Sequence, residues 1–123
     1  MAKKIITKKA KEKLAAARVT GKIARISHMA LGTGGTGEDG AVLPVDENYT
    51  ALNQEIIRKE ISVRKKTDTS YEYSIQLAAD ELLGASISEL AVIDEDGDLV
   101  AICHFLPKGK DDTEVTYKYE DAF

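Results

Sequence analysis

The sequence predicts an α+β domain in which one N-terminal helix packs on an antiparallel, sandwich-like β-sheet. Residues 8–18 contain almost only good helix formers. Residues 71–79 alternate between apolar and polar side chains, as a half-buried strand does. Two further apolar segments, residues 87–93 and 99–105, flank a short acidic turn. The length of 123 residues is that of one domain, so we expect residues 1–123 to fold as a single unit.

The predicted helix begins after Thr7, whose hydroxyl can cap it, and stops at Gly21, which suits the left-handed C-terminal position. Four apolar residues recur at helical spacing: Ile6, Ala10, Leu14 and Ala17. This stripe is too short to stabilise an isolated helix in water, so we expect it to dock on the sheet. Replacing Leu14 with Asp should then destabilise the fold as a core truncation and a buried charge do together.

The rest of the sequence predicts antiparallel strands. Residues 22–31 are rich in β-formers, and residues 57–63 precede a hairpin loop at 65–70 that leads into the alternating strand described above. Residues 115–119 alternate again, which predicts a last strand near the C-terminal end.

Residues 32–40 contain five glycines, which predicts an irregular loop. A phosphate-binding loop needs a Lys and a Ser or Thr after its last glycine, whereas here Glu38 and Asp39 follow Gly37 and would repel phosphate. We therefore interpret residues 32–48 as a mobile loop that becomes ordered against a neighbouring subunit. Its predicted contact residues are Gly32, Gly34, Gly35 and Gly37.

The acidic turn from Asp94 to Asp98 has some likeness to a calcium-binding loop. Its Gly97 comes too early for that pattern, and Phe105 stands where a Glu is needed. We interpret the segment as a hairpin turn closed by Gly97, and we expect no bound metal.

Residues suited to catalysis are few: His28, His104 and Cys103. Cys103 and His104 are neighbours on one predicted strand, so their side chains point to opposite faces. Cys103 could still meet His28 across the sheet, although a cysteine in an apolar strand usually serves as a small buried hydrophobe. We expect no catalytic residues, no enzyme activity and no cofactor.

Charge is unevenly distributed although the net charge is only −4. Residues 1–25 hold nine Lys or Arg against Glu12 alone, a balance of +8, and the remainder holds eight against twenty Asp or Glu, a balance of −12. We interpret Lys8, Lys9 and Lys13 as an assembly surface for another subunit or a second copy of the chain. The alternative is that these lysines form a helix face that is exposed to solvent and contacts no partner. The basic segment lacks interleaved aromatics, so we expect no nucleic-acid partner, and no apolar run is long enough to span a membrane.

Three segments in order resemble a known family. Residues 30–35 read Ala-Leu-Gly-Thr-Gly-Gly, residues 52–58 have the pattern L-x-x-E-x-x-R, and residues 87–101 are similar to I-x-E-x-G-L-x-D-x-D-G-x-L-V-A. Ala91 stands where the last pattern has Gly. Together they resemble the N-terminal domain of tail-collar fibre proteins of contractile-tailed bacteriophages and phage-like bacteriocins, over roughly residues 5–105.

The resemblance implies a virion structural protein of a phage or prophage, made in the bacterial cytoplasm and placed in the tail. It further implies a module that attaches a tail fibre to the baseplate, as a homo-oligomer with other tail or baseplate proteins as partners. Receptor recognition is not implied, because no fibre shaft or tip follows residue 123 in the sequence. The alternative from another class is a small cytoplasmic binding or regulatory module that places its basic helix on an acidic or nucleic-acid partner.

Overall fold

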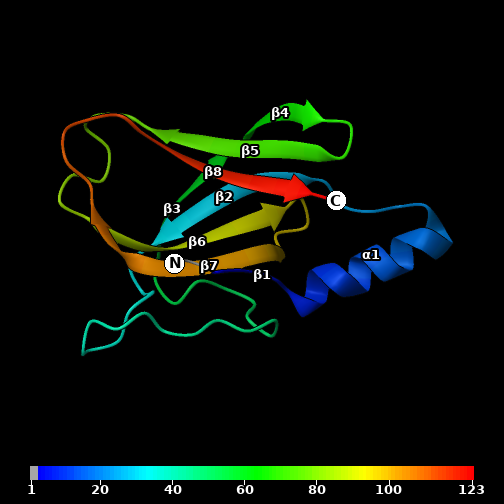
Figure 1. The fold of residues 1–123 in the computed structure, drawn as a ribbon, viewed down its shortest axis with the longest axis horizontal. Helices are drawn as coiled ribbons and strands as arrows, with labels where there is room; N and C mark the ends of the chain where they lie inside the picture. Colours follow the sequence, from blue (N-terminus) through cyan, green and yellow to red (C-terminus); the bar gives the residue numbers. More distant parts are fainter. Residues whose placement is uncertain (1–2) are drawn as a thin grey trace.

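The structure is a computed structural model and describes residues 3–123. Within this range the chain forms one helix and strands in two antiparallel sheets (Figure 1). The elements are β1 (Lys3–Ile6), α1 (Lys8–Thr20), β2 (Ile26–Gly32), β3 (Glu55–Glu60), β4 (Ser62–Thr67), β5 (Ser70–Leu77), β6 (Ser86–Asp94), β7 (Leu99–Gly109) and β8 (Val115–Ala122). The predicted α+β class is confirmed.

The strands pair mostly as the sequence predicts. The order in the larger sheet is β1-β7-β6-β2-β3, and in the smaller sheet it is β4-β5-β8. The hairpin β6–β7 and the last strand β8 confirm two predictions. The strand predicted over residues 57–63 is instead divided between β3 and β4, which belong to different sheets, and the hairpin loop predicted at 65–70 is shorter because β4 continues to Thr67. Strand β1 was not predicted. It pairs along β7 with Ile5 opposite Ile102, so the residues before the helix close one edge of the larger sheet.

The main core lies between the two sheets. Met29, Leu31 and Val92 of the larger sheet pack with Leu77 and Tyr119 of the smaller one, and all five are buried. Alternate residues of each strand point to one face of its sheet, which explains why the alternating segment 71–79 forms part of this core. Burial of aliphatic side chains at this interface is the main source of stability, at about 25 cal/mol per Å² of apolar area.

A second apolar cluster covers the opposite face of the larger sheet. Ala91, Ile93 and Ile102 of the sheet pack there with Leu52, which belongs to the long connection between β2 and β3. Figure 1 shows this connection running beneath the larger sheet, on the side away from the smaller one. The connection between β2 and β3, which contains the predicted irregular loop, therefore forms a third layer of the fold.

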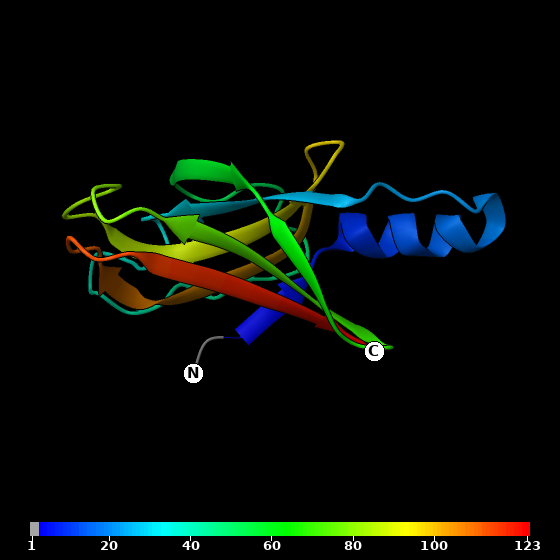
Figure 2. The same ribbon diagram turned by 90° about the horizontal axis from the view of Figure 1, so that it is seen from above.

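Helix α1 contacts the larger sheet at β7 through its first turn, where Ala10 is buried, but the docking predicted for Leu14 is wrong. Figure 2 shows it projecting past the ends of the strands. Ala10 is its only buried residue, while Leu14 keeps 48% of its surface exposed and Val19 keeps 89%. One face of the larger sheet is already covered by the smaller sheet and the other by the β2–β3 connection, so little sheet surface remains for the helix.

The predicted helix caps are confirmed. The Thr7 hydroxyl oxygen accepts a hydrogen bond from the Ala10 amide at 3.2 Å. Gly21 has a φ of 73° and donates its amide to the Ala17 carbonyl, as a left-handed C-terminal cap does. The Thr7 hydroxyl also donates to the Leu99 carbonyl at 2.5 Å, and the Thr7 amide donates to the Val100 carbonyl. These bonds fix the direction in which the helix leaves the sheet.

Candidate assembly surfaces

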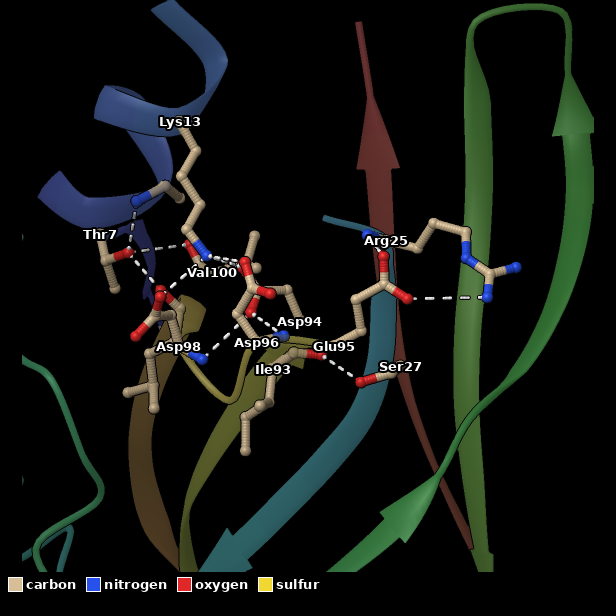
Figure 3. Close-up of polar contacts among 12 residues, drawn as sticks. Thr7, Lys13, Arg25, Ser27, Ile93, Asp94, Glu95, Asp96, Asp98 and Val100 are labelled. Atoms are coloured by element: carbon tan, nitrogen blue, oxygen red, sulfur yellow. Dashed lines mark hydrogen bonds and ion pairs between the residues drawn. The ribbon is translucent and has the colours of Figure 1, made fainter. Parts of the chain in front are cut away.

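Lys13 of α1 joins the helix to the acidic turn between β6 and β7 (Figure 3). Its Nζ lies 2.6 Å from Asp94 Oδ2, 3.0 Å from Asp96 Oδ2 and 2.8 Å from Asp98 Oδ2. The three carboxylates have ligand atoms within 4.8 Å of one another, a spacing that could hold a metal ion. Here the lysine ammonium lies among them and neutralises part of their charge. The turn therefore acts as the anchor of the helix.

The pKa values of this cluster reflect the ion pairs. Burial favours the neutral form of Lys13, but hydrogen bonds to Asp94, Asp98 and Asp96 outweigh this, so its pKa is raised above the ordinary value. The hydrogen bond from Lys13 holds the pKa of Asp98 below its ordinary value. The prediction that Lys13 lies on a free assembly surface is thus wrong, because its cation is engaged within the chain.

The other two lysines of that predicted surface are available. Lys8 and Lys9 are both exposed on α1. Their neighbour Lys11 pairs with Glu47 at 2.7 Å, which lowers the pKa of that carboxyl through the hydrogen bond. Exposed Arg18 and Lys22 continue the basic surface to the far end of the helix.

Buried Glu89 organises the glycine-rich segment. Its side chain is fully enclosed, and it accepts hydrogen bonds from three backbone amides: Gly34 at 2.9 Å, Asn53 at 2.8 Å and Gln54 at 2.7 Å. A buried carboxylate is stable only when such donors replace water. In the sequence, an acidic residue inside the apolar run 87–93 is the signal that indicates such a buried carboxylate.

The structure confirms that residues 33–48 form no helix or named strand, as predicted for the loop 32–48, and the first glycines of this segment allow it to pack closely on the sheet. A Cβ on Gly35 would lie 2.0 Å from the Ser88 carbonyl oxygen, and one on Gly32 would lie 2.4 Å from the Gln54 carbonyl oxygen. The Gly35 amide also donates to Ser88 Oγ at 2.8 Å. Gly32 and Gly35 are buried and cannot contact a partner, whereas Gly34 and Gly37 are partly exposed. The exposed part of the segment is its tip, residues 38–42.

His104 lies against the same carboxylate. Its Nε2 is 3.4 Å from Glu89 Oε1, and its Nδ1 donates to the Leu43 carbonyl at 2.9 Å. The ring also meets Tyr49 edge-on. His104 thus ties the end of the glycine-rich segment to the sheet.

Cys103 and His28 do not meet, because β6 lies between β7 and β2 in the sheet. Cys103 is buried, which raises the pKa of its thiol, and this fits the interpretation of Cys103 as a small hydrophobe. The open alternative of a Cys–His pair across the sheet is therefore contradicted.

An apolar groove lies between the projecting helix and the smaller sheet. We call α1 and the return segment 21–25 the arm, and the space beside it the arm groove, which measures about 490 Å³. Leu14 and Ile23 line it from the arm, and Val63, Tyr71 and Phe123 line it from the smaller sheet and the C-terminal end. In the part of the chain that the structure describes, no helix is long and apolar enough to span a membrane.

Fold and surfaces define a small two-sheet domain with a closely packed glycine segment and a basic arm that projects from one end. Residues 1–118 match the family described as phage tail-collar fibre protein, N-terminal, and the chain belongs to this family. Searches of curated proteins and of solved structures gave no match. The family assignment makes the chain a structural component of a phage tail.

Proposed function

We propose that residues 1–123 act as one attachment domain that joins a tail fibre to the baseplate during virion assembly, as a homo-oligomer and without catalysis. The observation that carries this proposal is the family match over nearly the whole chain. In a phage or prophage the domain is made in the host cytoplasm and then incorporated into the tail. Its partners are protein surfaces, and neither nucleic acid nor membrane is required.

The shape and charge of the domain support this role. The basic arm, with exposed Lys8 and Lys9, projects at one end (Figure 1). Asp111, Asp112 and Glu114 are exposed in the connection between β7 and β8. Figure 1 shows this connection at the end of the domain opposite to the arm. Surfaces of opposite sign steer association and set orientation, while apolar contacts supply most of the affinity.

Co-sedimentation with purified tail particles tests the proposal. We expect the domain to bind tails that lack their fibres, and binding should weaken as salt rises, because the Debye length falls from ~10 Å at 0.1 M to ~3 Å at 1 M. The variant Lys8→Glu/Lys9→Glu should bind at least tenfold more weakly. The matched control Lys108→Glu/Lys118→Glu makes the same charge change away from the arm and should bind as the unchanged protein does.

Binding to nucleic acid would weaken with salt in the same way, so only the identity of the partner distinguishes the attachment role from the regulatory alternative. Tight binding to duplex or single-stranded nucleic acid at physiological salt, with no binding to tail particles, would contradict the attachment role. It would favour the regulatory alternative.

A further inference from the structure

Strand β8 forms one edge of the smaller sheet (Figure 2). The strand order β4-β5-β8 pairs it with β5 alone, and this ladder runs without interruption from Ser70 opposite Ala122 to Leu77 opposite Val115. A regular edge strand carries a row of backbone amides and carbonyls that can pair with another strand. The outer side of β8 is therefore a candidate for strand-to-strand contact.

The other edge strand of the smaller sheet, β4, is less suited to such pairing. Its ladder with β5 is irregular between Lys65 and Thr67. Arg64, Lys65 and Lys66 are consecutive and exposed, so a second copy of β4 would bring like charges together. Bulges and lysines of this kind are how proteins protect their edges. Strand β8 has a regular ladder and carries charges of both signs, so it is the edge that can accept a strand.

Two hydrogen bonds show which backbone groups of β8 face outwards. The Phe123 amide donates to the Thr69 carbonyl on the β5 side at 3.0 Å. Alternate residues of an antiparallel ladder turn their backbone groups to the same neighbour, so residues 115, 117, 119 and 121 also face β5. The amides and carbonyls of residues 116, 118, 120 and 122 therefore face outwards. In agreement with this, the Glu120 carbonyl accepts a hydrogen bond from Lys4 Nζ of β1 at 3.2 Å.

The outer side of β8 is complementary to itself. When two copies of β8 run antiparallel with Tyr119 opposite Tyr119, each Lys118 lies opposite the Glu120 of the other copy. The outward-facing residues then form the hydrogen-bonded pairs of the new ladder, and their exposed side chains form two cross-strand ion pairs. A shift of two residues in either direction would instead place Lys118 opposite Lys118 or Glu120 opposite Glu120. Charge therefore selects one register.

The contacts that these residues make within the chain leave room for this pairing. Lys118 Nζ lies 3.9 Å from Glu72, and Glu120 lies 3.5 Å from Lys66 Nζ. Surface ion pairs at such distances contribute little, so Lys118 and Glu120 can turn to a partner at small cost. Lys4 is exposed, and its ammonium uses one of the two lone pairs of the Glu120 carbonyl.

We propose that two copies of the chain pair along β8 in this register, which joins their smaller sheets into one continuous sheet. This proposal rests on the homo-oligomeric attachment domain proposed above and names its self-contact. The contact is isologous, because the same strand serves on both sides, and it closes at two copies. It uses none of the lysines of α1, so the arm of each copy stays available to the tail.

A charge-swap series tests the contact, with light scattering and analytical ultracentrifugation as the readouts. The unchanged protein should reach a mass of two chains as its concentration rises. Lys118→Glu and Glu120→Lys should each weaken pairing by about tenfold, because each places like charges opposite one another twice, and the double variant should recover it. Arg64→Glu is the matched control, since it removes a 3.4 Å ion pair with the same Glu72 but lies on β4. It should leave pairing unchanged, and circular dichroism checks that each variant is folded.

Hydrogen exchange at two protein concentrations locates the contact without any substitution. The amides of Lys118 and Glu120 should exchange about tenfold more slowly when the copies are paired, because they then donate across the new ladder. The amides of residues 64–66 on β4 should exchange at the same rate at both concentrations. Exchange at Lys118 and Glu120 that does not depend on concentration would contradict pairing along β8.

The outcomes separate this inference from the attachment role. A single-chain mass at all concentrations, or a pair that neither single reversal weakens, overturns the proposed contact. Lys118→Glu should weaken pairing yet leave binding to fibre-less tails unchanged, because the arm lysines are intact. A chain that stays single and binds tails keeps the attachment role and loses the contact. A chain that pairs along β8 but never binds tails loses the attachment role alone.

Discussion

Lys13 Nζ lies 2.6 Å from the buried Oδ2 of Asp94, across 81 residues of sequence. This ion pair holds a helix whose only buried residue is Ala10. It also explains why a turn with three closely spaced carboxylates is stable beside the sheet. The attachment of the arm to the sheet therefore depends more on the Lys13 ammonium than on burial of the apolar stripe of the helix.

We expect Lys13→Met to be the most destabilising lysine substitution on the arm. The variant leaves three carboxylates without their cation, and Asp94 is 3% exposed. Breaking a partly buried ion pair by removing one partner should cost about 2–3 kcal/mol in the free energy of unfolding. Urea unfolding measures this, with Lys9→Met as the control on the exposed face. Equal free energies of unfolding for the two variants would contradict the claim that Lys13 anchors the helix.

Glu89→Gln should destabilise the domain strongly. The amide keeps the shape of the carboxylate but removes its charge and turns an NH₂ group toward amides that need an acceptor. Loss of buried, charge-assisted hydrogen bonds should cost about 3 kcal/mol or more. Thermal unfolding measures the effect, and Glu60→Gln, on exposed β3, is the control. A melting temperature within a degree of the unchanged protein would show that Glu89 does not hold the segment.

Gly35→Ala should prevent or severely weaken folding, whereas Gly109→Ala should change little. The added Cβ at Gly35 would lie 2.0 Å from a carbonyl oxygen, while one at Gly109 meets nothing within 4 Å. We expect a loss of at least ~3 kcal/mol at the first position and less than ~0.5 kcal/mol at the second. Soluble yield and urea unfolding provide the measurement. Equal tolerance at both positions would restore the mobile-loop interpretation.

Leu14→Asp should cost less than ~1 kcal/mol in stability, because an exposed side chain loses little burial on replacement. A helix docked through Leu14 would instead lose stability as a core truncation and a buried charge do together, so this substitution separates the projecting arm from a docked helix. Thermal melting of Leu14→Asp beside Leu77→Ala, a fully buried leucine, gives the comparison. A similar loss of stability in both variants would show that the helix packs on the sheet.

Stability should fall as the pH rises above about 10. The pKa of Lys13 is raised in the folded state, where hydrogen bonds to the aspartates outweigh desolvation, and burial raises the pKa of Tyr119 to about 12. Both groups hold their proton more tightly when folded. Their contribution is therefore complete below the ordinary pKa values near 10 and is lost at higher pH. Urea midpoints from pH 8 to 11 measure this, and Lys13→Met should show a shallower decline.

Local signals predicted most of the elements. Thr7 and Gly21 marked the helix ends, and strict alternation marked β5 and β8, because capping and pleating act over a few residues. The path of the helix was not predictable in this way. An apolar stripe shows that a helix can dock, but it does not show whether the rest of the chain leaves a sheet face free.

The candidate surfaces were harder to predict because their contacts join distant residues. Lys13 looked like an exposed lysine on a basic helix until the fold brought it to Asp94. The glycine segment looked mobile because composition does not reveal that Glu89 and Ser88 lie beside it. The family resemblance, by contrast, depends on ordered motifs, and the match over residues 1–118 confirms it.

Quantitative mass spectrometry of purified tail particles tests the central claim most directly. The account predicts that peptides of this chain occur in the particles in a constant copy number relative to the other tail proteins, and that the number survives a high-salt wash of the assembled tail. Finding the chain only in the lysate, with none in tails that are otherwise complete, would contradict its role as a tail component.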